Sequence, residues 1–105
     1  MDSDIPISEQ FRVVAKVWVE ADAAANLREE TKSAVLARMM IACGDMPVSR
    51  AEMQVKASND WHEFVTEMVE ARKKASELKV KLDYIKMKYH EQQSAEASRR
   101  AEMKL

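Results

Sequence analysis

The sequence is almost without residues that interrupt a helix, with one glycine and two prolines in 105 residues. This scarcity excludes folds that need many tight turns. The abundance of Ala, Glu, Lys, Met and Arg favours helix throughout. We therefore predict an all-α chain that forms a long helical hairpin with a coiled-coil-like C-terminal helix. We also expect it to be oligomeric, because long helices in so short a chain bury little core of their own.

Cysteine and long apolar runs are also scarce. The single cysteine, Cys43, excludes an intramolecular disulfide and favours a reducing compartment. It lies in a short apolar run and is expected to be an inert packed thiol. No apolar run approaches the roughly 20 residues that span a bilayer, and the acidic start does not resemble a signal peptide. We expect a cytoplasmic protein with no membrane partner.

The residues needed for catalysis are largely missing. One glycine cannot build a phosphate-binding loop. His62 and Glu63 resemble the start of a zinc-protease helix, but Thr66 stands where the second histidine belongs, and His90 is far along the chain. We expect both histidines to lie on helix surfaces, and we expect no enzymatic activity, no metal site and no cofactor.

Local signals divide the chain without creating separate domains. Residues 1–7 are expected to be a flexible lead-in, and residues 8–44 a first helix capped by Ser8. Gly44 and Pro47 predict a turn over residues 45–49, and Ser49 with Glu52 predicts a capping box. Residues 50–105 are expected to form a short helix, a break near residues 58–60, and a long basic helix that frays after about residue 92.

Small or apolar residues follow a heptad spacing in this last segment, at positions 57, 61, 64, 68, 71, 75, 78, 82, 85 and 89. The alternation of four and three residues is typical of a coiled-coil seam. We expect the oligomer seam to be formed by its large members, which are Trp61, Phe64, Met68, Leu78, Leu82, Ile85 and Tyr89.

Basic residues recur every seven positions on both sides of this seam. The segment Ala71–Tyr89 holds seven cations and two acids, and its cations are Arg72, Lys73, Lys74, Lys79, Lys81, Lys86 and Lys88. A parallel homodimer would place these cations against one another, so the helix must pack antiparallel, meet the first helix or bind an anion. A phosphate backbone fits cations spaced along a rod, and Tyr84 or Tyr89 could stack on unpaired bases. The other available partners are four acids of the first helix, Glu20, Asp22, Glu29 and Glu30, which could pair with several of these cations in an antiparallel hairpin.

The run from Leu78 to Tyr84, preceded by the basic stretch Ala71–Ala75, resembles the basic helix of the T4-type phage recombination mediators. Residues 100–104 are also similar to a later segment of that family. Proteins of that family load a recombinase onto single-stranded DNA, and the resemblance implies DNA contacts by Lys79 and Lys81. In this chain the heptad continues through Ile85–Tyr89, where the family has a glycine-containing turn. If the chain is phage-encoded, its place is the host-cell cytoplasm.

These observations lead to two hypotheses for function. The first is a single-stranded-DNA-binding accessory protein of phage recombination or replication, which oligomerises and can meet a recombinase or replication protein. Its nucleic-acid-binding residues are the seven cations and Tyr84. The alternative is a non-enzymatic helical adaptor or scaffold that does not bind nucleic acid, with its cations paired to acidic helices.

Overall fold

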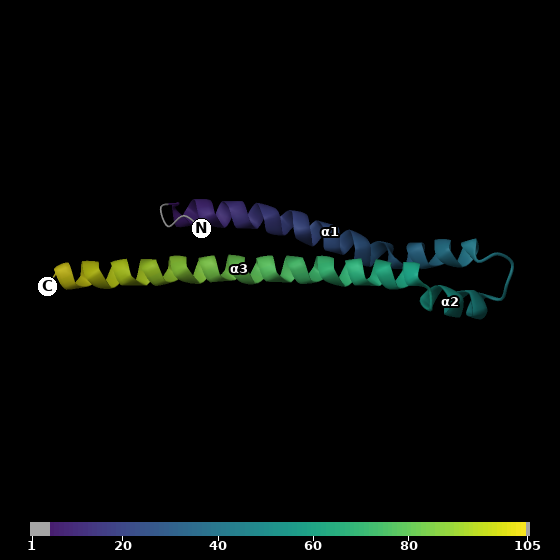
Figure 1. Cartoon of the computed structure of the whole chain (residues 1–105). Helices are drawn as coiled ribbons and strands as arrows, with labels where there is room; N and C mark the ends of the chain where they lie inside the picture. Colours follow the sequence, from purple (N-terminus) through teal and green to yellow (C-terminus); the bar gives the residue numbers. More distant parts are fainter. Residues whose placement is uncertain (1–4, 105) are drawn as a thin grey trace. The chain divides into compact units, whose positions relative to one another are not determined.

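Three helices form the part of the chain that the computed structural model describes, residues 5–104. Helix α1 spans Ile7–Ala42, α2 spans Val48–Lys56 and α3 spans Asn59–Met103 (Figure 1). No strand occurs in these residues, so the predicted all-α fold is confirmed. The chain divides into two compact units. Unit 1 joins the part up to Val19 to the part from Ser76 onward, and unit 2 is Glu20–Ala75.

Helices α1 and α3 contribute to both units and run antiparallel within each. In unit 1, Trp18 meets Lys79 and Phe11 meets Lys86. In unit 2, Arg28 meets Glu67, and Arg72 meets Asp22. In these pairs, a residue later in α1 contacts a residue earlier in α3, which is the pattern of two antiparallel helices. The predicted helical hairpin is therefore present.

The turn between α1 and α2 depends on glycine. Gly44 has a φ of +93°, in the left-handed region that residues with a Cβ adopt at a cost. Its N–H donates to the Ile41 carbonyl at 3.1 Å, and the Cys43 N–H donates to the Met40 carbonyl at 3.1 Å. These bonds satisfy carbonyls at the end of α1, as expected for a helix that ends on a left-handed glycine.

Helices α1 and α2 begin earlier than their serines predicted. The Pro6 carbonyl accepts the N–H groups of Glu9 and Gln10, so α1 starts at Ile7 and Ser8 is not its cap. Pro47 is the N-cap of α2, and its carbonyl accepts the Ala51 N–H at 3.0 Å. The capping box predicted at Ser49 is wrong, because proline at the N-cap loses no helical hydrogen bond and places Ser49 inside the first turn.

Ser58 separates α2 from α3, as the sequence predicted. Its hydroxyl accepts the Trp61 N–H at 3.2 Å and donates to the Val55 carbonyl. One side chain thus ties the end of α2 to the start of α3. At the other end, α3 remains helical to Met103, so the fraying predicted after residue 92 is not what the structure shows. The part of the lead-in up to Asp4 lies outside the described residues.

Unit 1 is held together by a short apolar seam. Val14 of α1 packs with Leu82 and Ile85 of α3, and all three side chains are buried. The partly buried side chains around them are Ile7, Phe11, Ala15 and Trp18. The buried positions on both helices follow the alternation of four and three residues, which explains how two helices keep one line of contact.

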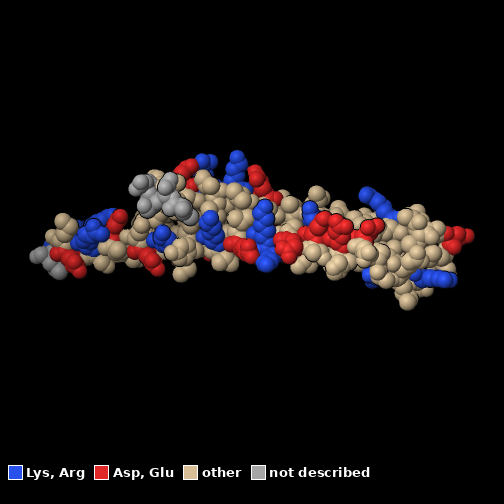
Figure 2. Space-filling model, in the orientation of Figure 1, with Lys and Arg blue, Asp and Glu red and all other residues tan. Residues whose placement is uncertain are grey.

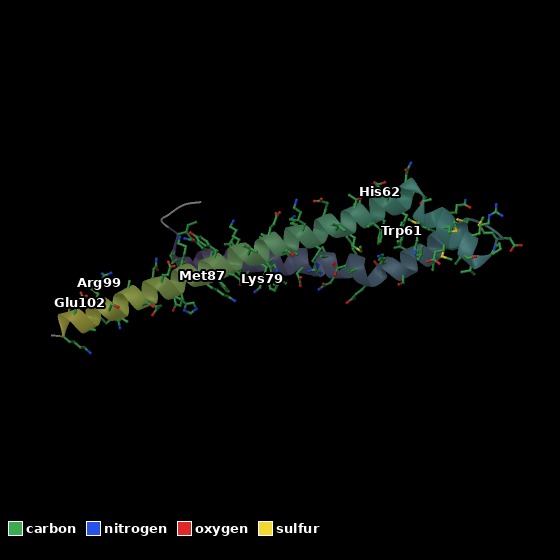
Figure 3. All side chains as sticks on the ribbon, turned by 90° about the horizontal axis from the view of Figure 1, so that it is seen from below. Trp61, His62, Lys79, Met87, Arg99 and Glu102 are labelled. Carbon is green, nitrogen blue, oxygen red and sulfur yellow. The ribbon has the colours of Figure 1, made fainter. Side chains whose placement is uncertain are left out.

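Unit 2 has a core of small side chains and one large ring. Ala25 and Ala75 are almost fully buried, as are Ala51 and Val55. Trp61 is buried, and its ring stacks on Phe64 with centroids 5.6 Å apart. Figure 3 shows Trp61 directed between the helices and the neighbouring His62 directed outward. Small side chains allow the helices of this unit to approach closely.

The large seam residues predicted on α3 are buried or half-buried, except for Tyr89. Tyr89 is 48% exposed, which contradicts its expected burial on the seam. The physical reason is that α1 starts at Ile7, so among the described residues this helix has none beyond Ile7 to cover that end of the stripe. Every described residue from Tyr89 to Lys104 is exposed.

Candidate nucleic-acid interface

Two rows of cations flank the seam on α3, and their surroundings differ. The first basic row consists of Arg72, Lys79 and Lys86, and the second basic row consists of Lys74, Lys81 and Lys88. Lys73 lies on the outer side of the helix and is exposed.

Arg72 forms hydrogen bonds with several side chains of α1. Its Nε and Nη2 donate to the two carboxylate oxygens of Glu29 at 2.8 and 2.9 Å. Its Nη1 donates to Asp22 at 2.8 Å, and Nη2 also donates to the Asn26 side-chain carbonyl at 2.6 Å. This two-point contact with Glu29 matches the fork of the guanidinium to the carboxylate. Two of the acids named from the sequence as possible partners are thus used by one arginine, and Asn26 was not foreseen.

The same contact shifts the titration of both groups. Hydrogen bonds from Arg72 hold the pKa of Glu29 below its usual value of 4.5, against a smaller opposing effect of desolvation. The hydrogen bonds to Glu29 and Asp22 raise the pKa of Arg72 in turn. Arg72 therefore stays charged, but its donors are directed at α1, which leaves little of it for an external phosphate.

The two lysines of the first basic row cover the core of unit 1. The Lys79 ammonium lies 5.1 Å from the centre of the Trp18 ring and 3.3 Å from an Asp83 carboxylate oxygen. The Lys86 ammonium lies 5.8 Å from the Phe11 ring. Cation–π contacts at exposed sites contribute about 0.5–1 kcal/mol, so both ammonium groups retain the ability to bind an anion. The rings of α1 were not anticipated, although Phe11 and Trp18 are seven residues apart and so share a heptad position.

The second basic row has no acidic partner on α1. Among the described residues, no carboxylate lies within 4.0 Å of the ammonium groups of Lys74, Lys81 or Lys88. The reason lies in α1: Asp22 and Glu29 are seven residues apart and meet the first row, whereas Val17 and Ala24, also seven apart, carry no charge. Lys74 and Ala24 line the same open groove between the two helices.

Exposed aromatic rings accompany this second row in unit 1. Tyr84 is 59% exposed, and the Lys88 ammonium lies 5.7 Å from its ring centre. Tyr89 is exposed as well and contacts the His90 ring edge-on at 5.7 Å. A lysine next to an exposed tyrosine ring is a combination that single-stranded nucleic acid can use, because the phosphate meets the cation while the base stacks on the ring.

The two units differ in charge. The described residues of unit 1 hold nine Lys and Arg against six Asp and Glu, whereas unit 2 holds eight against ten. Figure 2 shows acidic side chains between the basic ones on the face in view, so the cations do not form one unbroken basic surface there. The excess of positive charge thus resides in unit 1, with Lys81, Lys86 and Lys88 as its exposed or part-exposed lysines near the tyrosines.

Other residues with possible chemistry are dispersed. Within residues 5–104, no three His, Cys, Asp or Glu side chains gather closely enough to hold a metal ion. Cys43 is half-buried, and its thiol donates to the Met39 carbonyl at 3.4 Å. None of the described helices combines the length and the apolarity needed to cross a membrane.

Comparison of the chain with protein-family models, with curated proteins and with solved structures finds no match.

Proposed function

We propose that the chain binds single-stranded DNA without sequence specificity, through the basic surface of unit 1. The site consists of Lys81, Tyr84 and Lys88, with Lys86 beside them. The observation that carries the proposal is the unpaired state of Lys81 and Lys88 next to an exposed tyrosine. Lys79 extends the positive track within unit 1. Lys73 and Lys74, which the sequence predicted as part of the same track, belong to unit 2, where Arg72 serves mainly to join α3 to α1.

The geometry suits a single strand better than a duplex. Lys81 and Lys88 are two helical turns apart, which is about 10 Å along the axis. Phosphates of a flexible strand can adjust to this spacing, and only unpaired bases offer a face to Tyr84. Together with the resemblance to recombination mediators, this favours an accessory role in phage recombination or replication, in the host-cell cytoplasm, with a recombinase or replication protein as a further partner.

The test is the salt dependence of binding. Fluorescence anisotropy with a labelled single-stranded oligonucleotide gives a slope of log affinity against log salt of about −0.7 for each phosphate neutralised. Changing Lys81 and Lys88 together to Ala is expected to make the slope shallower by about 1.4. The matched control changes Lys32 and Arg38 to Ala, because both are exposed cations of unit 2 on α1. Equal slopes for the two double variants would falsify the proposal.

A second candidate is an assembly module, supported by the exposed apolar surface. Fourteen large apolar side chains among the described residues are exposed, whereas eight apolar residues are buried and three of those are alanines. The exposed ones occur in both units, for example Val80 and Met87 in unit 1 and Ile41 and Val48 in unit 2. Such a ratio is expected of a hairpin that buries further surface against other helices. Light scattering across protein concentrations tests this role, and a monomer at all concentrations would exclude it.

A further inference from the structure

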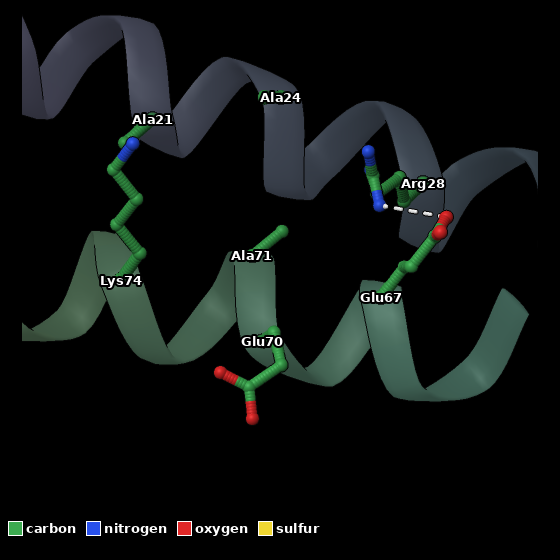
Figure 4. A pocket seen from close by; sticks show the side chains of 7 residues that line it. All are labelled: Ala21, Ala24, Arg28, Glu67, Glu70, Ala71 and Lys74. Carbon is green, nitrogen blue, oxygen red and sulfur yellow. Dashed lines mark hydrogen bonds and ion pairs between the residues drawn. The ribbon is translucent and has the colours of Figure 1, made fainter. Parts of the chain in front are cut away.

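Unit 2 contains an open groove between α1 and α3 with a volume of about 440 Å³. Its floor is made by Ala21 and Ala24 of α1 and Ala71 of α3, and its sides carry charged residues of both helices (Figure 4). Small side chains on the floor let another helix approach the groove closely. This fit alone does not identify an occupant, but the charges around the groove do.

Four charged side chains border the groove, and their charges sum to zero. Arg28 lies 3.4 Å from Glu67, which makes a weak, exposed ion pair across the groove. Lys74 and Glu70 have no oppositely charged group within 4.0 Å in the described residues. Figure 4 shows Lys74 extended toward Ala21, whereas Glu70 is directed away from α1. One unpaired cation and one unpaired acid therefore lie one helical turn apart on the same helix.

We infer that this groove is the contact surface for a second copy of the chain, with the two α3 helices antiparallel. In that orientation Lys74 of each copy lies opposite the span from Glu67 to Glu70 of the other. The midpoint between Lys74 and the span from Glu67 to Glu70 falls near Ala71, on the floor of the groove. A two-fold rotation axis passing near Ala71 therefore generates both contacts. A surface that is complementary to itself in this way is what a two-fold dimer requires.

The charge order along α3 supports this orientation beyond the groove. The stretch from Asp60 to Glu70 carries four acids and no Lys or Arg, and the next residues, Arg72–Lys74, are three cations in succession. Arg72 is already bound to α1 and Lys73 lies on the outer side, so antiparallel copies place the acidic stretch of one opposite Lys74 of the other, whereas parallel copies place like charges together. Leu27, three residues after Ala24 on α1, is 63% exposed and adds apolar surface on the same side of that helix.

Nucleic acid is a poorer occupant of this groove. Glu67 and Glu70 both border it, and carboxylates repel phosphate. The interface specifies the assembly role and does not rest on nucleic-acid binding, because the proposed DNA site is the surface of unit 1 around Tyr84.

The experiment exchanges the charges between two variants. Lys74→Glu makes the groove acidic, and Glu70→Lys makes it basic while leaving the Arg28–Glu67 pair in place. Sedimentation velocity up to about 100 μM, a range that reaches weak dimers, is run on the wild type, on each variant and on their equal mixture. Circular dichroism checks that helicity is unchanged. Native mass spectrometry with one variant labelled with nitrogen-15 identifies the mixed dimer.

We expect the wild type to dimerise and each single variant to dimerise at least about tenfold more weakly. The mixture is expected to recover the wild-type affinity as a heterodimer. Lys73→Glu is the matched control, since it makes the same charge change on the outer side of α3 and should leave the dimer intact.

Four results would overturn the inference. The first is a wild-type chain that stays monomeric over the whole range. The second is a mixture that does not form the heterodimer. The third is a Lys73→Glu control that weakens the dimer as much as Lys74→Glu does. The fourth is a Lys74→Glu variant that dimerises as strongly as the wild type, which would show that Lys74 makes no contact across the interface. Loss of oligonucleotide binding by the unit 1 variants alone would leave this interface unaffected.

Discussion

Replacing Ile85 by Ala tests the seam that holds unit 1 together. The Ile85 side chain is 3% exposed and packs with Val14 and Leu82. Its truncation removes buried apolar atoms and leaves a space that only two helices surround. Large-to-small substitutions of this kind cost about 2–5 kcal/mol in protein cores.

The expected cost lies at the low end of that range, about 2–3 kcal/mol. The described part of unit 1 is a pair of helices with no third layer. The helices can therefore move together to fill part of the space, and water can reach the remainder. For a domain of this size, the midpoint of thermal unfolding should fall by about 10–20 °C. Thermal and urea denaturation followed by circular dichroism measure both quantities.

Ile41→Ala is the matched control. It makes the same chemical change in a helix, but Ile41 is 78% exposed, in the last turn of α1. The two substitutions share the same gain in helix propensity, so their difference reports burial. We expect Ile41→Ala to change stability by no more than about 0.5 kcal/mol. Equal losses for the two variants would refute the assignment of Ile85 to a buried seam.

Three further outcomes are expected. Because the pKa of Glu29 is lowered by Arg72, the pair stabilises the fold above pH 4.5 and is lost as the pH falls through the lowered pKa. Stability measured by urea denaturation should therefore decline less between about pH 5 and 3 in Arg72→Gln than in the wild type, and parallel curves would contradict this. Tyr84→Ala should weaken single-stranded DNA binding by about tenfold in anisotropy titrations and leave duplex binding unchanged; an equal loss for both would argue against stacking. Gly44→Ala should cost about 1–2 kcal/mol because of its positive φ, with open space around the new Cβ, and Gly44→Asn should cost less in the same denaturation assay.

Periodicity and turn residues were sufficient to predict the fold. The alternation of four and three residues predicted which side of α3 is buried, and Gly44 and Ser58 marked the two breaks between helices. Ser8 and Ser49 were wrongly predicted as caps because each follows a proline by two residues. In both cases the carbonyl of that proline accepts the first helical N–H groups, so the helix starts before the serine.

The sequence of α3 alone could not predict which of its cations are paired with acids. Arg72 and Lys74 both flank the seam and look equivalent in sequence, yet Arg72 meets Glu29 and Asp22, whereas Lys74 meets alanines. Which row is neutralised depends on the register of α1 against α3. That register comes from the heptad of α1, at positions 7, 11, 14, 18, 21, 25 and 28, which the valine-rich composition of this segment obscures.

The reversal of the chain between α1 and α3 has a consequence for the order of folding. Contacts between α1 and α3 close chain loops that lengthen with distance from the turn. The loop is 39 residues for Arg28 with Glu67 and 50 for Asp22 with Arg72. It is longer still for Phe11 with Lys86. The entropy lost on closing a loop grows with the length of the loop. Contacts between α1 and α3 should therefore form first near the turn and last near Phe11, and those near Phe11 should also break first. Hydrogen exchange is therefore expected to be slowest around Trp61 and faster toward Phe11 and Lys86, so the surface of unit 1 that is proposed to bind DNA should also be the part that opens most readily.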